Sequence, residues 1–165
     1  MRAPTPSQTV GPFFGFALPF EHDADAVEKV AYGTAGESRQ AMRVEGQVLD
    51  GAGNPVDDAL VEAFQNDQFA RCRTDGEGAF HFTLRKPVVS DGAPRFNITV
   101  FSRGLLRHLH TRMYFPDEES ANRADRVLQL VDESRRHTLI ARGNGDIVHF
   151  DIRLQGEGET VFFAF

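Results

Sequence analysis

Alternation of apolar and polar residues with a period of two limits the fold of this chain more than any other feature. In RVEGQVLD, Val44, Gly46 and Val48 share one face of an extended strand. The same spacing recurs in AFHFTL, RFNITVF and IVHFDIRL, whose inward residues are Phe80, Phe82, Leu84, Phe96, Ile98, Val100, Val148, Phe150, Ile152 and Leu154. Turn-forming clusters separate these segments at 50–56, 74–78, 90–94 and 142–146. We therefore expect an all-β sandwich or barrel.

Three other segments carry different predictions. Residues 116–132 have apolar side chains at helical spacing and acidic residues in the first turn, which predicts a surface helix of about three turns. Residues 21–32 are expected to form a short helix at most, after an extended, proline-rich arm. Residues 160–165, TVFFAF, are predicted to form a strand after a turn at GEGE.

Length and composition exclude several classes of protein. A chain of 165 residues fits a single domain, here an N-terminal arm with loops at 1–42 and a sandwich core at 43–165. The net charge of −6 argues against a nucleic-acid partner. No apolar run approaches the roughly 20 residues of a membrane span, and the N-terminal residues lack a signal-peptide pattern, so we expect a cytoplasmic protein. The lone Cys72 cannot form an internal disulfide.

The segment RHLHTRMYF (107–115) contains the most conspicuous candidate metal ligands. His108, His110, Arg112 and Tyr114 have one parity on an extended strand and would share a polar face. Two imidazoles with phenolates from Tyr114 and Tyr32 could hold a ferric ion. However, a rise of about 3.3 Å per residue puts Tyr114 roughly 13 Å from His110 along the strand. These residues favour a polar strand face at an interface, and a metal site remains the alternative interpretation.

Five segments in a fixed order resemble the alpha chains of the intradiol ring-cleavage dioxygenases. The resemblance covers most of the chain and is weakest over 18–43. The first and last segments are the most specific. The segments are TPSQTVGPFF (5–14), EGQVLDGAGNPVDDALVEAFQND (45–67), RTDGEGAFHFTLRKP (73–87), APRFNITVFSRGLLRHLHTRMYFPDE (93–118) and FDIRLQGEGETVFFAF (150–165). The resemblance implies a β-sandwich of the intradiol dioxygenase type.

The same resemblance implies that this chain lacks the family's iron ligands. Members that carry Fe(III) hold it through two tyrosines and two histidines. Here Arg95 and Asn97 stand at the histidine positions, and Val88, Val89 and Ser90 stand where a tyrosine is expected. A permanent cation at Arg95 would also repel a metal ion. The implied chain is a non-metallated subunit whose homologous beta-chain partner holds the iron and cleaves protocatechuate with O2 to 3-carboxy-cis,cis-muconate.

By the same resemblance, Thr9, Gly11 and Pro12 in the arm border the partner's substrate pocket, and Arg103 lies near its rim. Gly11 is expected to use backbone angles that a β-branched residue cannot adopt. An excess of Phe, 15 with no Trp, suggests that some aromatic side chains are buried against the partner. Two alternatives are a non-catalytic sandwich module and a self-sufficient catechol dioxygenase that uses His108, His110 and both tyrosines.

Overall fold

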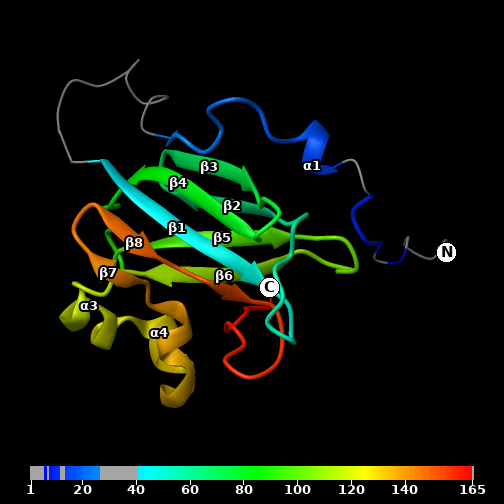
Figure 1. Ribbon diagram of the computed structural model, residues 1–165. Coiled ribbons are helices and arrows are strands. Elements are labelled where there is room, and N and C mark those ends of the chain that lie inside the picture. Colours follow the sequence, from blue (N-terminus) through cyan, green and yellow to red (C-terminus); the bar gives the residue numbers. More distant parts are fainter. Residues whose placement is uncertain (1–5, 7, 12–13, 27–40, 165) are drawn as a thin grey trace, which may run out of the picture.

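The chain forms two β-sheets that face each other, as the computed structural model shows for residues 6, 8–11, 14–26 and 41–164 (Figure 1). The first sheet has the order β4–β1–β8–β7, and β9 also pairs with β1. It comprises β1 (Ala41–Leu49), β4 (Ala79–Arg85), β7 (Arg142–Asn144), β8 (Ile147–His149) and β9 (Ile152–Arg153). The second sheet has the order β3–β2–β5–β6 and comprises β2 (Leu60–Gln65), β3 (Gln68–Arg73), β5 (Arg95–Phe101) and β6 (Leu109–Tyr114). The predicted all-β sandwich is confirmed.

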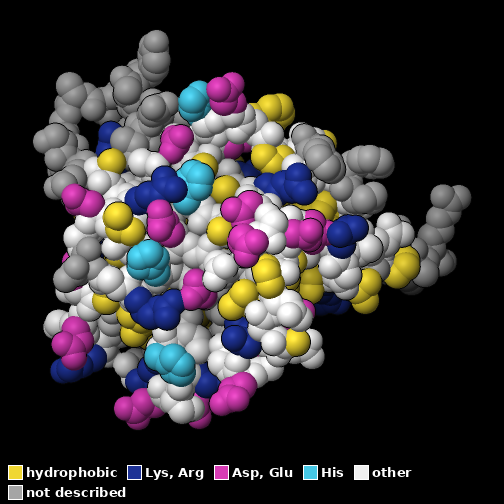
Figure 2. Space-filling model, in the orientation of Figure 1, with side chains coloured by type: hydrophobic (Ala, Val, Ile, Leu, Met, Phe, Trp, Pro, Cys, Tyr) yellow, Lys and Arg dark blue, Asp and Glu magenta, His cyan; other side chains and the backbone are white. Residues whose placement is uncertain are grey.

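The apolar faces predicted from the alternation meet between the two sheets. Phe82 and Phe96 are fully buried there. The other predicted inward residues are buried as well, except for Leu154, which is partly buried. Each buried side chain of this size contributes roughly 1.5–3 kcal/mol through removal of apolar surface from water. The outer face of the first sheet is polar instead: Figure 2 shows acidic, basic and histidine side chains intermixed over β1, β4 and β8.

The strand predicted for IVHFDIRL is divided into β8 and β9. Between the two, the backbone N–H of Gln47 donates to Oδ1 of Asp151 at 3.1 Å, so a side chain accepts where a ladder carbonyl normally would. The backbone at Phe150 approaches β1 so closely that a Cβ added to Gly46 would lie 1.9 Å from the carbonyl oxygen of Phe150. Glycine is therefore required at this position in β1.

The single helix predicted for residues 116–132 is wrong. The segment forms α3 (Glu119–Ala124) and α4 (Arg126–Leu130), and a 3₁₀ helix, η2 (Glu133–Leu139), follows. The break falls at Asp125, whose backbone is extended (φ −68°, ψ 122°). Oδ1 of Asp125 accepts the backbone N–H groups of Val127 and Leu128, which caps the start of α4. Helical periodicity continues across this residue, so only the cap and its tertiary contacts end α3.

Tyr114 is fully buried, which corrects the expectation that it shares a polar face with the histidines of its strand. It lies in a second apolar cluster with Ala93, Leu128, Val131 and Leu139, under α4 and η2. In Figure 1 these helices lie beside the β6 and β7 edge of the sandwich. The helical segments that follow β6 in the sequence thus fold back and cover one end of an otherwise alternating strand.

The two ends of the described chain are less regular. The short helix α1 (Phe14–Ala17) precedes turns at 21–24 and a single bridge from Asp25 to Thr83. The strand predicted at 160–165 is reduced to one bridge, in which Phe163 pairs with His110 at the edge of β6. None of the helices in the described part of the chain has the length and apolar character of a membrane span.

Candidate functional site

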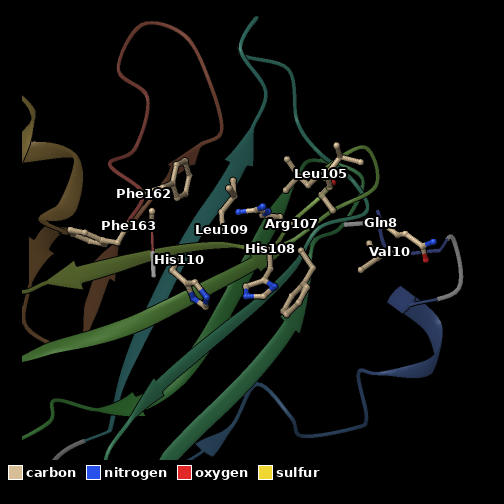
Figure 3. Close-up of a pocket in the computed structure, with 13 residues that line it drawn as sticks. Gln8, Val10, Leu105, Arg107, His108, Leu109, His110, Phe162 and Phe163 are labelled. Carbon is tan, nitrogen blue, oxygen red and sulfur yellow. The ribbon is translucent and has the colours of Figure 1, made fainter. Parts of the chain in front are cut away.

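A cavity of about 640 Å³ lies where the loop between β5 and β6 meets the N-terminal arm and the C-terminal residues (Figure 3). Three segments of the described chain line it, and the residues are Gln8, Val10, Phe101, Ser102, Leu105, Leu106, Arg107, His108, Leu109, His110, Phe162, Phe163 and Ala164. Most of these side chains are apolar or aromatic. A largely apolar cavity with a few polar groups is the usual form of a small-molecule site.

The arm is attached to this site by one hydrogen bond from a residue predicted to border it. The backbone N–H of Gly104 donates to Oγ1 of Thr9 at 3.0 Å, which joins positions 95 residues apart. Gln8 and Val10, on either side of Thr9, line the cavity. The structure thus brings Thr9 next to the loop that carries Arg103.

Asp58 holds that loop in place. Its carboxylate accepts a hydrogen bond from Oγ of Ser102 at 3.2 Å and forms an ion pair with Nε of Arg103. The Asp58 side chain is 18% exposed and that of Arg103 is 59% exposed. The hydrogen bond and the charge of Asp58 raise the pKa of Arg103. Arg103 therefore lies at the rim of the site, with its charge compensated within the chain.

Of the other two arm residues predicted for the site, Pro12 lies outside the described residues. Gly11 is described, and its φ is not in the left-handed region. A Cβ added to Gly11 would meet no atom of the described chain within 4 Å. The expectation that its backbone angles require glycine is therefore wrong for this chain by itself.

His108 and His110 lie together beside the cavity. Their rings are edge to face with centroids 4.5 Å apart, and His108 also contacts the ring of Phe101 at 5.4 Å. Nδ1 of His110 lies 3.3 Å from Oγ1 of Thr99. Burial and the neighbouring His108 both lower the pKa of His110. His110 is therefore neutral at pH 7, and the pair presents polar aromatic rings to the site.

Arg95 and Asn97, which the resemblance matches to iron-ligand positions, are poorly suited to bind iron. Arg95 is 8% exposed, and its Nη1 donates to the backbone carbonyls of Asp91 at 2.9 Å and Ala93 at 3.1 Å. The amide of Asn97 donates to Oε1 of Gln65 at 3.1 Å. A buried guanidinium and a hydrogen-bonded amide are poor ligands for a hard trivalent cation. Tyr32, the second tyrosine of the chain, lies outside the described residues.

The buried Arg95 belongs to a network centred on Asp125. Oδ2 of Asp125 accepts the backbone N–H of Ala93 at 3.0 Å and lies 4.0 Å from Nη1 of Arg95, and Oδ1 accepts the hydroxyl of Tyr114 at 3.0 Å. Burial alone would raise the pKa of this carboxyl. The hydrogen bonds from Leu128, Ala93 and Tyr114, together with the charge of Arg95, outweigh burial and hold the pKa of Asp125 below its usual value. Across the described ranges, no group of three or more His, Cys, Asp or Glu side chains is arranged to hold a metal ion.

Comparison with known proteins places this sandwich in a family. The family model described as "Dioxygenase" matches residues 10–106, which is more than half of the chain. The chain belongs to the dioxygenase family. The protocatechuate 3,4-dioxygenase alpha chain of Burkholderia cepacia is 38% identical, with 96% of each chain covered. The alpha chain of the Pseudomonas putida enzyme is 39% identical, with 98% of this chain and 96% of the relative covered.

A beta chain is also related to this dioxygenase-family chain. The protocatechuate 3,4-dioxygenase beta chain of Burkholderia cepacia is 28% identical over 86% of this chain and 74% of its own length. Among solved structures, the dioxygenase domain of a Streptomyces carbohydrate-binding fusion protein matches with a TM-score of 0.63 at 22% identity, over 93% of this chain and 99% of that one. Catechol 1,2-dioxygenase from Pseudomonas arvilla matches with a TM-score of 0.52 at 20% identity, over 73% of this chain and 54% of that one. These two structures support the shared fold, and intradiol dioxygenases depend on iron.

Sequence reasoning missed most of the cavity lining. Leu105, Leu106 and Arg107 follow a Gly in a loop, and no local pattern distinguishes them from ordinary solvent-exposed loop residues. Phe162 lies in the predicted C-terminal strand and belongs to the excess of Phe that is expected to be buried against the partner. The excess of Phe in the N-terminal arm and the C-terminal strand indicated aromatic side chains beyond the needs of the core, but not that Phe162 and Phe163 line a cavity.

Proposed function

We propose that this chain is the alpha subunit of protocatechuate 3,4-dioxygenase. The enzyme cleaves protocatechuate with O2 to 3-carboxy-cis,cis-muconate. The observation that carries the proposal is the match to two alpha chains of that enzyme at 38% and 39% identity over nearly the full length of this chain. The cavity lined by the arm and the β5–β6 loop supports it, because its apolar and aromatic walls suit a small aromatic ring.

The Fe(III) of the enzyme belongs, in this proposal, to a homologous beta chain, with which this chain forms a hetero-oligomer of alpha–beta protomers. Two observations support the assignment. Arg95 and Asn97 occupy the positions of ligand histidines, and both side chains are already engaged within the chain. A beta chain with its own similarity to this sequence also exists in Burkholderia cepacia. Ferric iron in the partner would supply the activation of the aromatic diol toward O2.

This chain contributes scaffold and pocket wall. Thr9, Gly11 and Pro12 border the partner's substrate pocket, and Arg103 lies near its rim. The bond from Gly104 to Thr9 supports this role, because it holds the arm against the loop. Since a Cβ at Gly11 meets open space in this chain, a requirement for glycine there would have to come from the partner subunit.

Exposed aromatic residues on the second sheet supply a docking surface for the partner. Phe64 and Phe69 are directly opposite each other on β2 and β3, with 51% and 38% of each residue exposed. Val88 is 56% exposed, and its carbonyl accepts a hydrogen bond from Asn66 in the β2–β3 turn. Exposed apolar side chains grouped in this way usually mark an interface. The isolated chain is therefore expected to self-associate or to be poorly soluble.

The proposal is tested by expressing the chain alone and together with the reading frame adjacent to it. We expect the two chains to purify together, with iron and protocatechuate cleavage present only in the complex. Stoichiometric iron in the chain alone would contradict the assignment and favour a self-sufficient catechol dioxygenase. A soluble, iron-free monomer that binds no second chain would favour a non-catalytic sandwich module.

A further inference from the structure

A second cavity, of about 210 Å³, lies between the end of η2, the segment that carries β8 and β9, and the turn at 156–160. It shares no lining residue with the cavity at the arm. Its lining residues are Leu49, His137, Thr138, Ile140, Arg142, His149, Phe150, Asp151, Arg153, Gly158 and Thr160. This volume is below the roughly 300–1,000 Å³ of sites for drug-sized molecules, so the second cavity suits a small ligand.

The lining of the second cavity carries more positive than negative charge. The guanidinium groups of Arg142 and Arg153 accompany a single carboxylate, that of Asp151. Oδ2 of Asp151 forms an ion pair with Nη2 of Arg142, and Oδ1 accepts the backbone N–H of Gln47 at 3.1 Å. Each carboxylate oxygen therefore has a partner already, and the charge of Arg153 is left over. This local surplus contrasts with the net charge of −6 of the whole chain.

Arg153 differs from the neighbouring arginines, because no carboxylate of the described residues pairs with its guanidinium. Arg135, on η2, pairs with Glu159 at 3.5 Å, and Arg142 pairs with Asp151. The charges of these two arginines are thus compensated within the chain. The charge of Arg153 is the one that an anionic ligand would compensate.

The fold holds the backbone of Arg153 in place. Its N–H donates to Oγ1 of Thr160 at 2.9 Å, and its carbonyl accepts the N–H of Thr160, a buried residue, at 3.0 Å. Arg153 also lies opposite Leu49 where β9 pairs with β1. Its side chain is partly buried, and both Nη atoms would lie 3.8 Å from a Cβ on Gly53. Only this side chain has to be ordered further when an anion binds, which limits the entropic cost of binding.

Two histidines add further nitrogen groups to the lining. His137 comes from η2 and His149 from β8, and Nδ1 of His149 lies 3.9 Å from Oε2 of Glu45, beyond hydrogen-bond distance. The hydroxyls of Thr138 and Thr160 already form hydrogen bonds within the chain. Guanidinium and imidazole N–H groups donate to oxyanions. The lining therefore offers a ligand mainly N–H donors.

We infer that the second cavity binds a small oxyanion with two or more charges, a phosphate or a small polycarboxylate, through Arg153, His137 and His149. A guanidinium can bind two oxygens of such an ion at once. Because the three residues come from η2, β8 and β9, the bound ion links these elements. The inference goes beyond the proposed function and does not depend on it, since every lining residue belongs to this chain.

The test uses the purified protein, in complex with its partner chain where the two purify together. Equilibrium dialysis against radiolabelled inorganic phosphate, in chloride buffer of constant ionic strength, measures the number of bound ions and the dissociation constant. Wild type, Arg153→Gln and Arg153→Lys are compared with Arg126→Gln, which removes an exposed arginine that lines neither cavity. Unlabelled tricarballylate serves as the competing polycarboxylate, and circular dichroism checks that each variant is folded.

We expect one phosphate ion per copy of this chain, with a dissociation constant of about 1 mM, because water in an open cavity weakens the attraction between charges. Arg153→Gln should raise the dissociation constant about fivefold, because a charged contact is lost. Arg153→Lys should lie between the two, because it keeps the charge but loses the two-pronged geometry. Arg126→Gln should match wild type. Displacement by tricarballylate would include polycarboxylates among the ligands, and its failure would restrict the site to inorganic oxyanions.

Three results would overturn the inference. The first is no phosphate binding by the wild-type protein at about ten times the expected dissociation constant. The second is binding that Arg153→Gln leaves unchanged, because the ion would then lie elsewhere, for example at the iron of the partner chain. The third is an equal loss in Arg126→Gln, which would show an effect of net charge alone. None of these results bears on the proposed function, which co-purification and ring cleavage test separately.

Discussion

The two ends of the β5–β6 pair use charge in opposite ways. At one end, Arg95 pairs with Tyr114 across the strands, and both side chains are buried in the network around Asp125. At the other end, the strands open into the loop that carries Arg103 and Arg107 beside the cavity. Both ends contain arginine, aromatic residues and hydrogen-bonding groups, so composition does not distinguish them.

The difference lies in how completely each charge is compensated. The Asp125 side chain is 3% exposed and lies 4.0 Å from Nη1 of Arg95. It accepts hydrogen bonds from the backbone N–H groups of Ala93 and Leu128 and from the hydroxyl of Tyr114. A buried charge is tolerated only with such partners. At the cavity end, Arg103 is paired with Asp58, while the exposed Arg107 forms no ion pair with a carboxylate of the described residues. The buried end therefore stabilises the fold, and the open end is suited to meet a ligand.

Removal of Asp125 should have the largest effect of the changes considered. Asp125→Ala deletes the cap of α4, leaves the Tyr114 hydroxyl without its acceptor and leaves Arg95 without the nearest buried carboxylate. We expect the free energy of unfolding to fall by about 3 to 5 kcal/mol. Urea titration followed by circular dichroism at low protein concentration measures the change.

Asp132→Ala is the matched control, because Asp132 caps η2 through the N–H of Ser134 but is exposed. Loss of this cap should lower the free energy of unfolding by only about 1 kcal/mol. Equal effects of the two substitutions would show that the Asp125 network adds nothing beyond a helix cap, and the contrast between the two ends of the strands would be lost.

Acid should weaken the buried end selectively. Because the folded-state pKa of Asp125 lies below its ordinary value of about 3.9, the unfolded chain binds this proton more readily. The stabilisation is therefore complete above roughly pH 5 and is lost as the pH falls through the folded-state pKa. Asp125→Asn, which has no proton to bind there, should differ most from wild type at pH 7 and less at pH 3. A difference that stays constant between the two pH values would contradict this assignment.

At the open end, a smaller effect is expected from loss of the arm contact. Thr9→Val removes the acceptor for the N–H of Gly104 while it keeps the side-chain shape. One net hydrogen bond corresponds to about 0.5–1.5 kcal/mol, so the KM of the complex for protocatechuate should rise by roughly threefold. Thr9→Ser keeps the hydroxyl and should leave KM unchanged. If the serine variant were impaired as much as the valine variant, the methyl group rather than the hydrogen bond would be responsible.

The two histidines should have no effect on the metal. His108 and His110 contact Phe101, Thr99 and each other, and the proposed iron lies in the partner chain. His108→Ala and His110→Ala are therefore expected to leave the iron content of the purified complex unchanged, as measured by atomic emission. Loss of iron in either variant would mean that this strand contributes to the metal site and would remove the assignment of iron to the beta chain.

Much of the fold follows from local sequence alone. Residues such as Val44, Phe82 and Ile98 alternate with polar neighbours, and a strand that covers a core can place only one parity inward. Segments bounded by Gly, Asn and Asp could be recognised as turns for the same local reason; Asp75, for example, accepts the N–H groups of Glu77 and Ala79 within its own turn. The five family motifs added the identity of the sandwich, and the resemblance implied from Arg95 and Asn97 that this chain lacks iron ligands.

Tertiary structure decided what depends on contacts between distant residues. The helical pattern of 116–132 continues through Asp125, and only hydrogen bonds to Ala93 and Tyr114 show why the chain turns there. Asp58 and Arg103 are 45 residues apart, and no local pattern pairs them. The same is true of the cavity, because the arm, the β5–β6 loop and the C-terminal residues meet only after the sheets have formed. Local periodicity therefore determined which side chains face the core, while long-range packing determined which charges are compensated and which remain available to a ligand.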